Sequence, residues 1–435
     1  MSENTGAVKE ESPTKNVEEL IEVLSTKPET PTLNQDSPKN DFFILQDFWP
    51  LFKFSQILGF FPCKKEMDEK GAMELKPIRW WISVIRILGL SIFVTIPRKL
   101  LGLLLISSSE EASDYYNNEF LPRVFLSNSA RSYVTRFFMP VNRVLLLSCF
   151  LSFVIKRKKL CALQAIFSSP LNDMTMKRTN TVRKARVYSI LIITLSLIAI
   201  VATVLYIYLP LLKLLTNNAS IVLGIFIAFL NGMYFCIFHF IMINTVILYF
   251  QLTCNIINLI EEIDLDSMKL VVILENTANL MKKVKMTSSF LSLQCFFMIL
   301  FLTALLTVQI FSLCDYLTGT SQFPKSTYVA IVATILWSTL ILCIVNWQSY
   351  DVKQRLSEIR FHIFNFAITE NNLVVIEKQK HPEEYARNVV MSMIDEFKGF
   401  DANGYFTLGK ELLGGIIMLC ITYVFVLIRF RTPIN

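Results

Sequence analysis

Long apolar runs constrain this chain more than any other feature. The clearest one, 187–212, contains no charged residue and is long enough to cross a hydrocarbon layer of about 30 Å as a helix. Because a backbone inside lipid must satisfy its own hydrogen bonds, each such run is expected to be helical. We therefore predict an all-α integral membrane protein with seven transmembrane helices. They are expected near 80–106, 131–155, 187–212, 221–250, 288–314, 327–347 and 407–429.

The composition agrees with a membrane protein. Charged residues make up 18% of the chain, against about 25% in soluble globular proteins, and the mean hydropathy is +0.48. A net charge of +7 is compatible with nucleic acid binding, but the basic residues cluster beside the apolar runs. We therefore expect a lipid bilayer around the chain and no nucleic acid partner.

Lysine and arginine divide unevenly between the predicted loops. The loops 156–186, 251–287 and 348–406 together hold 20 of them, whereas the alternate loops hold 3. Basic residues accumulate on the cytoplasmic side of membrane proteins. With seven spans, this places the N-terminus inside and the C-terminus outside. Asn218-Ala219-Ser220 is a glycosylation sequon in a short predicted outer loop, and its occupancy is left open.

The predicted cytoplasmic segments differ in character. Residues 1–41 are polar and rich in proline, so we expect them to be disordered, with no signal peptide. Segment 42–78 is expected at the inner interface and begins with an amphipathic helix within 42–62. Segment 348–406 predicts two amphipathic helices around a turn near His381-Pro382. Their apolar face has helical spacing, and we expect sister subunits to bury it. It includes Leu356, Ile359, Ile363 and Phe366.

The sequence contains no pattern typical of an enzyme or a metal site. Acid–base pairs, nucleophile elbows and phosphate-binding loops are missing, so we expect no catalysis and no cofactor. The nine cysteines lie mostly in apolar runs or basic loops, without the spacing of a zinc site. We expect them to be free thiols.

The last apolar run ends in Thr422-Tyr423, five apolar residues, Arg429 and Phe430. This ending resembles the closing motif of insect gustatory receptors, which is Thr-Tyr, five hydrophobic residues, Gln and Phe. The upstream stretch 404–408 (GYFTL) also resembles the entry into that family's last helix. In topology the resemblance covers the whole chain. The chain departs from the motif at Arg429, where the family has Gln.

The resemblance implies a tetrameric, ligand-gated, non-selective cation channel whose pore is lined by the last helix. Four arginines in a narrow pore would repel cations, so we expect Arg429 to snorkel to the outer headgroups. If Arg429 faces the pore instead, mixed assembly with other subunits becomes the better interpretation. The alternative is that this face packs against the fifth and sixth spans. The predicted pore residues share or border one helix face: Leu419, Thr422, Tyr423, Val426 and Arg429.

The resemblance also implies a ligand site in the outer half of the helical bundle. Polar groups within a span are costly unless paired, which draws attention to Asn231 and Gln309. The alternative is that interfacial aromatic residues only anchor the chain in the membrane. The predicted ligand-binding residues are Tyr133, Phe137, Tyr206, Asn231, Tyr234, Gln309, Tyr328 and Trp337, with Tyr208 nearby.

Taken together, these features predict an insect taste receptor subunit in the plasma membrane of sensory neurons, with a small-molecule tastant as ligand. Val424 stands where sugar receptors of the family commonly carry Glu, which favours a bitter or other non-sugar ligand. Alternatives are an insect odorant receptor, a secondary transporter, or a G-protein-coupled receptor with its N-terminus outside. The expected organisation is a six-helix ligand-binding bundle (79–347), a cytoplasmic anchor (348–406) and the pore helix with its short tail (407–435).

Overall fold

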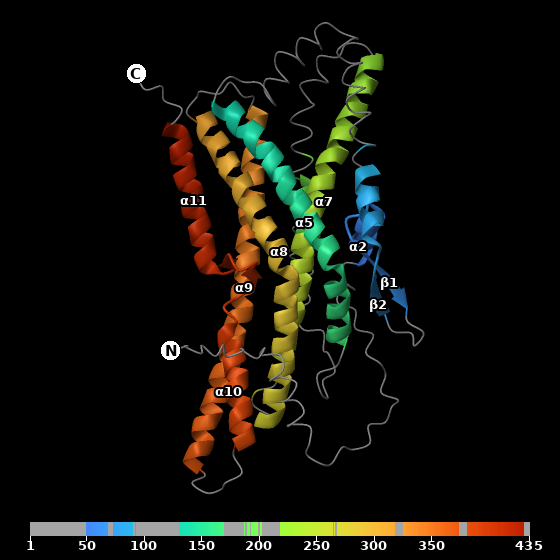
Figure 1. Cartoon of the computed structure of the whole chain (residues 1–435). Helices are drawn as coiled ribbons and strands as arrows, with labels where there is room; N and C mark the ends of the chain where they lie inside the picture. Colours follow the sequence, from blue (N-terminus) through green and yellow to red (C-terminus); the bar gives the residue numbers. More distant parts are fainter. Residues whose placement is uncertain are drawn as a thin grey trace, which may run out of the picture.

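The chain folds into an elongated bundle of long helices (Figure 1). The computed structural model describes residues 49–67, 73–89, 92, 130–168, 187, 189–191, 193–198, 201, 218–263, 265, 268–317, 325–373 and 381–429. The predicted disordered segment 1–41 lies outside these residues.

Four helices in the described part of the chain are much longer than a membrane crossing requires. They contain 39, 45, 48 and 49 residues, against about 20 for one crossing. Helical structure therefore continues beyond the predicted spans into the loops after 155 and 250. The helices are α5 (Ala130–Ser168), α7 (Asn218–Glu262), α8 (Leu270–Leu317) and α9 (Lys325–Leu373).

Three parts of these helices are long and apolar enough to cross a membrane: Phe240–Glu262, Leu270–Cys314 and Ile331–Phe366. Two shorter apolar helices, Trp80–Gly89 and Ser189–Ile198, fall within the predicted first and third spans. Most of the remainder of those two spans lies outside the described residues. The mostly helical membrane fold is thus confirmed, whereas the number of crossings and the side of each terminus stay predictions.

The core lies where α7, α8 and α9 meet, with α5 packed on α8. On α7 every residue from Ile241 to Phe250 is buried, because this helix is apolar around its whole circumference and has neighbours on all sides. Tyr249 is fully buried, and its hydroxyl donates to the carbonyl oxygen of Val345 at 3.0 Å. That bond satisfies the one polar atom of a large buried ring.

The N-terminal described segment combines a helix with a β-hairpin. Helix α2 (Trp49–Ile57) falls within the amphipathic helix predicted for 42–62. It is followed by β1 (Cys63–Met67) and β2 (Met73–Pro77), which pair antiparallel with Cys63 opposite Pro77. The expectation of an all-α protein is wrong here. Both strands are short, charged and poor in β-branched residues, so the sequence carries little strand signal.

The segment 348–406 folds against its own chain. Helix α9 continues to Leu373, and α10 (His381–Glu396) begins at the predicted turn. Leu356, Ile359 and Ile363 are at most 1% exposed, because α10 and α8 cover them. The expectation that sister subunits bury this face is therefore wrong.

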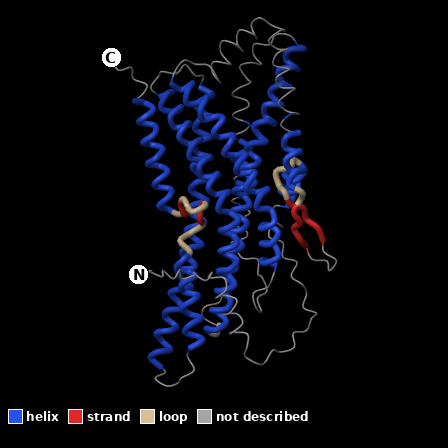
Figure 2. Tube along the Cα trace, in the orientation of Figure 1, coloured by secondary structure: helices blue, strands red, loops and turns tan. Residues whose placement is uncertain are grey.

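A second short antiparallel pair, β3 (Asp401–Ala402) and β4 (Phe406–Thr407), follows α10. It leads into the last helix, α11 (Lys410–Arg429), which coincides with most of the predicted seventh span. Figure 2 shows this small strand pair beside the long helices, between α10 and α11.

Candidate functional site

Helix α11 lies along the outside of the bundle (Figure 1). It packs on α8 and α9 through a narrow stripe, in which Ile416, Cys420 and Val424 are at most 6% exposed. The spacing of four residues keeps these side chains on one face. Cys420 accepts a hydrogen bond from the Thr307 hydroxyl at 3.3 Å, and Val424 packs against Phe311. Leu412 and Leu413, near the start of the helix, are partly buried against the same core, and most of the other described side chains of α11 are exposed.

The predicted pore residues lie on the exposed part of α11. Leu419, Tyr423 and Val426 expose 46%, 51% and 41% of their surface. Thr422 is exposed too, and its hydroxyl donates to the Met418 carbonyl oxygen at 2.9 Å. Arg429 is exposed at the end of the helix. The side chains of α11 that are buried against α8 and α9 are those of the stripe, not these predicted pore residues.

The start of α11 is fixed by hydrogen bonds to α9. The Ser349 hydroxyl accepts from the Phe400 amide at 3.1 Å and donates to the Leu408 carbonyl oxygen at 2.8 Å. One turn earlier on α9, the Asn346 side-chain oxygen accepts from the Gly409 amide at 3.0 Å. All three bonds are buried, so each satisfies a backbone group that water cannot reach. We call residues 399–409, together with Asn346 and Ser349, the α9 junction.

The backbone of the junction is tightly shaped. Gly399 has a φ of +135°, and a Cβ placed there would meet the Leu408 carbonyl oxygen at 2.7 Å. The Asp401 carboxylate accepts from the Gly404 amide at 2.8 Å, closing a turn that contains Asn403 at a φ of +56°. Tyr405 stacks on Phe296 of α8, with ring centroids 4.9 Å apart. The junction therefore sets both the position and the direction of α11.

Lys410, the first residue of α11, lies over two aromatic rings of α9. Its ammonium nitrogen is 3.5 Å from the centroid of Tyr350 and 4.8 Å from that of Trp347. A cation at a helix N-terminus opposes the helix dipole, and the two ring faces offset this cost.

The structure describes the side chains of three of the predicted ligand residues. Trp337 is 3% exposed, and its indole N–H donates to the Ser196 hydroxyl at 2.7 Å, so it packs inside the bundle. Gln309 on α8 is half-buried, and Tyr328 near the start of α9 is 39% exposed.

For four of the other predicted ligand residues, the structure gives the helix on which each lies. Tyr133 and Phe137 lie near the N-terminal end of α5, and Asn231 and Tyr234 lie in the first half of α7. These positions belong to the same end of the bundle as the C-terminal end of α11 (Figure 1). Tyr206 and Tyr208 lie outside the described residues.

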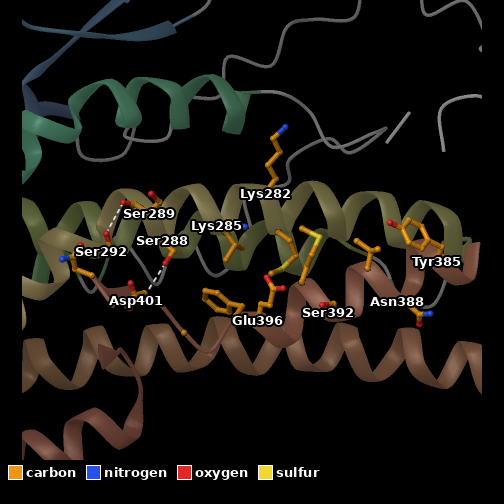
Figure 3. A pocket seen from close by; sticks show the side chains of 17 residues that line it. Lys282, Lys285, Ser288, Ser289, Ser292, Tyr385, Asn388, Ser392, Glu396 and Asp401 are labelled. Carbon is orange, nitrogen blue, oxygen red and sulfur yellow. Dashed lines mark hydrogen bonds between the residues drawn. The ribbon is translucent and has the colours of Figure 1, made fainter. Parts of the chain in front are cut away.

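A groove of about 800 Å³ runs between α8 and α10, at the opposite end of the bundle from these residues. Figure 3 shows Lys282 and Lys285 on the α8 side and Glu396 on the α10 side. At one end the Asp401 amide donates to Ser288 at 3.4 Å. None of the predicted ligand residues lines this groove.

The comparisons with known proteins identify the fold. No protein-family model matches the chain, and no curated protein matches it. Two solved structures of the insect olfactory receptor OR5 from Machilis hrabei do match, one of them in complex with eugenol. The chain has the fold of an insect olfactory receptor.

The likeness extends over almost all of that receptor. The eugenol complex matches with a TM-score of 0.60 and 13% identity, over 89% of this chain and 99% of the receptor chain. The structure named without eugenol matches with a TM-score of 0.56 and 13% identity, over 88% and 97%. At this identity the shared property is the olfactory receptor fold.

Within this fold, sequence reasoning missed the residues that position the last helix. Asn346, Ser349 and Gly399 were not among the predicted site residues. The hydrogen-bond partners of Asn346 and Ser349 lie 51 to 63 residues away in the sequence. The dipeptide Asn403-Gly404 is a local turn signal, and it was the one indication of a sharp bend before α11.

Proposed function

We propose that this chain is an insect chemoreceptor of the gustatory type, acting as a ligand-gated, non-selective cation channel. The proposal rests mainly on one coincidence. The ending that resembles the gustatory receptor motif begins at Thr422, and its residues up to Arg429 form the end of the last helix of an insect olfactory receptor fold. Two independent lines, one from the sequence and one from the fold, therefore support the same superfamily.

The proposed pore is lined by α11 in a tetramer. An isolated copy leaves Tyr423, Phe425 and Val426 between 41% and 69% exposed, which is a large apolar face for one helix. Lipid covers part of such a face, and sister copies of α11 around a common axis cover the rest. On the cytoplasmic part of α9, Phe361 and Phe364 are 65% and 49% exposed and provide a second surface for sister subunits.

The proposed ligand is a small organic molecule that enters the outer half of the bundle. The similar olfactory receptor was solved in complex with eugenol, a molecule of that size class. Binding would act by shifting the population from closed to open tetramers, since a ligand with higher affinity for the open state must do so. Val424 in place of the Glu of sugar receptors favours a non-sugar tastant.

An odorant receptor is the second candidate, because both matching structures are olfactory receptors. The two candidates share the channel mechanism and differ in ligand and partner subunits. Expression in oocytes, with one panel of non-volatile tastants and one of volatile molecules, distinguishes them. Current evoked by non-volatile tastants supports the gustatory type, whereas current evoked by volatile molecules alone supports an odorant receptor.

The first test locates the two termini. Epitope tags at both ends are stained in intact and in permeabilised cells expressing the full chain. We expect the C-terminal tag to stain in intact cells at the plasma membrane and the N-terminal tag only after permeabilisation. An N-terminal tag accessible in intact cells would contradict the channel proposal and would favour a G-protein-coupled receptor.

The second test measures ligand-evoked current. We expect a current that reverses near 0 mV with mixed sodium and potassium solutions, as for a non-selective cation pore. A transport current that depends on the gradient of the ligand itself would instead indicate a secondary transporter.

A further inference from the structure

Two cysteines distant in the sequence lie side by side in the fold. Cys63 opens β1, Cys161 lies on α5, and they are 98 residues apart. Their sulphur atoms are 3.9 Å apart. A disulfide has an S–S distance of about 2.05 Å, so side-chain rotation with a small backbone shift can join them.

The two thiols have unequal surroundings. Cys63 is fully buried, and its sulphur lies 3.8 Å from the Arg157 carbonyl oxygen. Cys161 is half-buried, so it is the more exposed of the two residues. The pKa of the Cys161 thiol lies below its usual value, chiefly because Cys63 hydrogen-bonds to it, and the Arg157 guanidinium acts in the same direction. The pKa of Cys63 is raised by the same hydrogen bond and by burial.

Other buried cysteines in the described part of the chain lack this arrangement. Cys149 contacts the Thr245 hydroxyl at 3.2 Å, and Cys254 accepts from the Gln348 side chain at 3.2 Å. Burial in apolar surroundings disfavours the thiolate, and the thiolate is the nucleophilic form of cysteine. They serve as internal controls for the pair.

We propose that Cys63 and Cys161 form a dithiol modification site that peroxide oxidises to a disulfide. The Cys161 thiolate attacks one oxygen of hydrogen peroxide, the O–O bond breaks, and a sulfenic acid and hydroxide form. Cys63 then attacks the sulfenic sulphur, the S–O bond breaks, and the leaving oxygen departs as water with the Cys63 proton. Two thiols lose two electrons in total, and peroxide is reduced to water.

The new bond would connect the β1–β2 hairpin to α5. Strand β2 already packs against α5, so the disulfide would lock an existing contact. The closed loop contains the whole predicted first span, and it would tie the inner ends of the first two spans together. Oxidation would thereby restrict movement between these elements.

The redox state of the pair before any treatment depends on the orientation of the chain, and this step therefore rests on the proposed function. With the N-terminus inside, both thiols face the cytoplasm, where glutathione keeps cysteines reduced. With the opposite orientation they would face an oxidising compartment and be joined without any treatment. The redox state before treatment therefore tests the orientation separately from the reactivity.

The test uses the full chain expressed in intact cells. Free thiols are alkylated before lysis, with and without prior exposure to hydrogen peroxide, and peptides are mapped by mass spectrometry. We expect alkylated Cys63 and Cys161 in untreated cells. After peroxide we expect a peptide pair joined through these residues, lacking two hydrogen atoms and reversed by dithiothreitol, while Cys149 and Cys254 stay unlinked.

Each other outcome has a defined meaning. Sulfinic acid on Cys161 without a crosslink, or no change at peroxide levels that oxidise cytosolic thiols, would overturn the proposal. A pair already joined in untreated cells would support the geometry and contradict the orientation. Cys161→Ser should abolish the crosslink with little effect on folding, since the position is half-buried. Cys63→Ala provides the second variant, and there Cys161 should accumulate as a mixed disulfide with glutathione.

Discussion

The α9 junction is followed directly in the chain by α11, whose outer face includes Leu419, Thr422, Tyr423 and Val426. The two regions differ in their packing. In the junction, Phe400 and Ala402 are fully buried, and Ser349 and Asn346 bond the backbone on either side. On α11, most side chains beyond the stripe at Ile416, Cys420 and Val424 are exposed. The difference indicates that one copy of the chain completes the junction alone, whereas most of the last helix stays uncovered.

The comparison has a mechanical consequence. Along its length α11 has one buried side-chain hydrogen bond to α8, from Thr307 to the weakly accepting sulphur of Cys420. A tilt of α11 about its first residue would break this contact while the hydrogen bonds of the junction stay intact. The junction would then serve as a fixed pivot for the proposed opening of the pore. Changes in the junction should therefore damage folding, whereas changes on the outer face of α11 should alter function in a folded receptor.

The largest effect is expected for Gly399→Ala. Its φ of +135° is strained for any side chain, and the new Cβ would lie 2.7 Å from the Leu408 carbonyl oxygen. We expect a destabilisation of about 3 kcal/mol or more, combining backbone strain with a steric clash. The measurement is the thermal midpoint of the detergent-solubilised chain by size-exclusion chromatography.

Two glycines provide matched controls for that variant. Gly404→Ala meets no atom within 4 Å but keeps a φ of +80°, so it should show the strain alone. Gly414→Ala lies in α11 with open space around it and should cause no loss, since Ala favours a helix over Gly by about 1 kcal/mol. If Gly414→Ala proved as damaging as Gly399→Ala, the contrast between the two regions would be wrong.

The second-largest loss of stability is expected for Ser349→Ala. This change leaves the Phe400 amide and the Leu408 carbonyl oxygen buried without their partner. We expect a loss of about 2 kcal/mol, the cost of unsatisfied buried groups, seen as a lower thermal midpoint. Ser338→Ala is the control on the same helix, because Ser338 is equally buried but bonds only the Thr334 carbonyl oxygen of its own helix. Equal losses for both would mean that the junction bonds carry no special role.

The sequence predicted the two regions unequally, and the reason is physical. Apolar runs and their 3.6-residue period are local properties, so the long helices and the position of α11 could be read from them. The Ser349 and Asn346 bonds join residues 51 to 63 positions apart, and no local pattern encodes them. The hairpin of β1 and β2 was missed because Lys64, Lys65 and Glu66 resemble an exposed loop. The expected pore residues could be predicted only through the family resemblance, since periodicity does not tell lipid from lumen.

A smaller effect is expected within α11 itself. Val424→Ala removes two methyl groups that pack against Phe311, and we expect a loss of about 1 kcal/mol. Val426→Ala, two residues on, removes the same groups from a side chain that is 41% exposed. That variant should keep the wild-type thermal midpoint and instead change the ligand-evoked current if α11 lines the pore. A Val426→Ala receptor that unfolds earlier than Val424→Ala would reverse the assignment of the two faces.

The smallest effect is expected for Arg429→Gln, which restores the residue of the gustatory receptor motif. Arg429 is exposed at the last residue of α11. A guanidinium that snorkels to phosphates contributes little to the field in the pore, so conductance and cation selectivity should stay within error of wild type in paired recordings. Arg429→Lys, which keeps the charge, is the matched control. If Arg429→Gln raised the single-channel conductance several-fold while Arg429→Lys did not, the four arginines would face the pore. In that case the chain would function in mixed tetramers, because partner subunits with Gln at this position would dilute the positive ring.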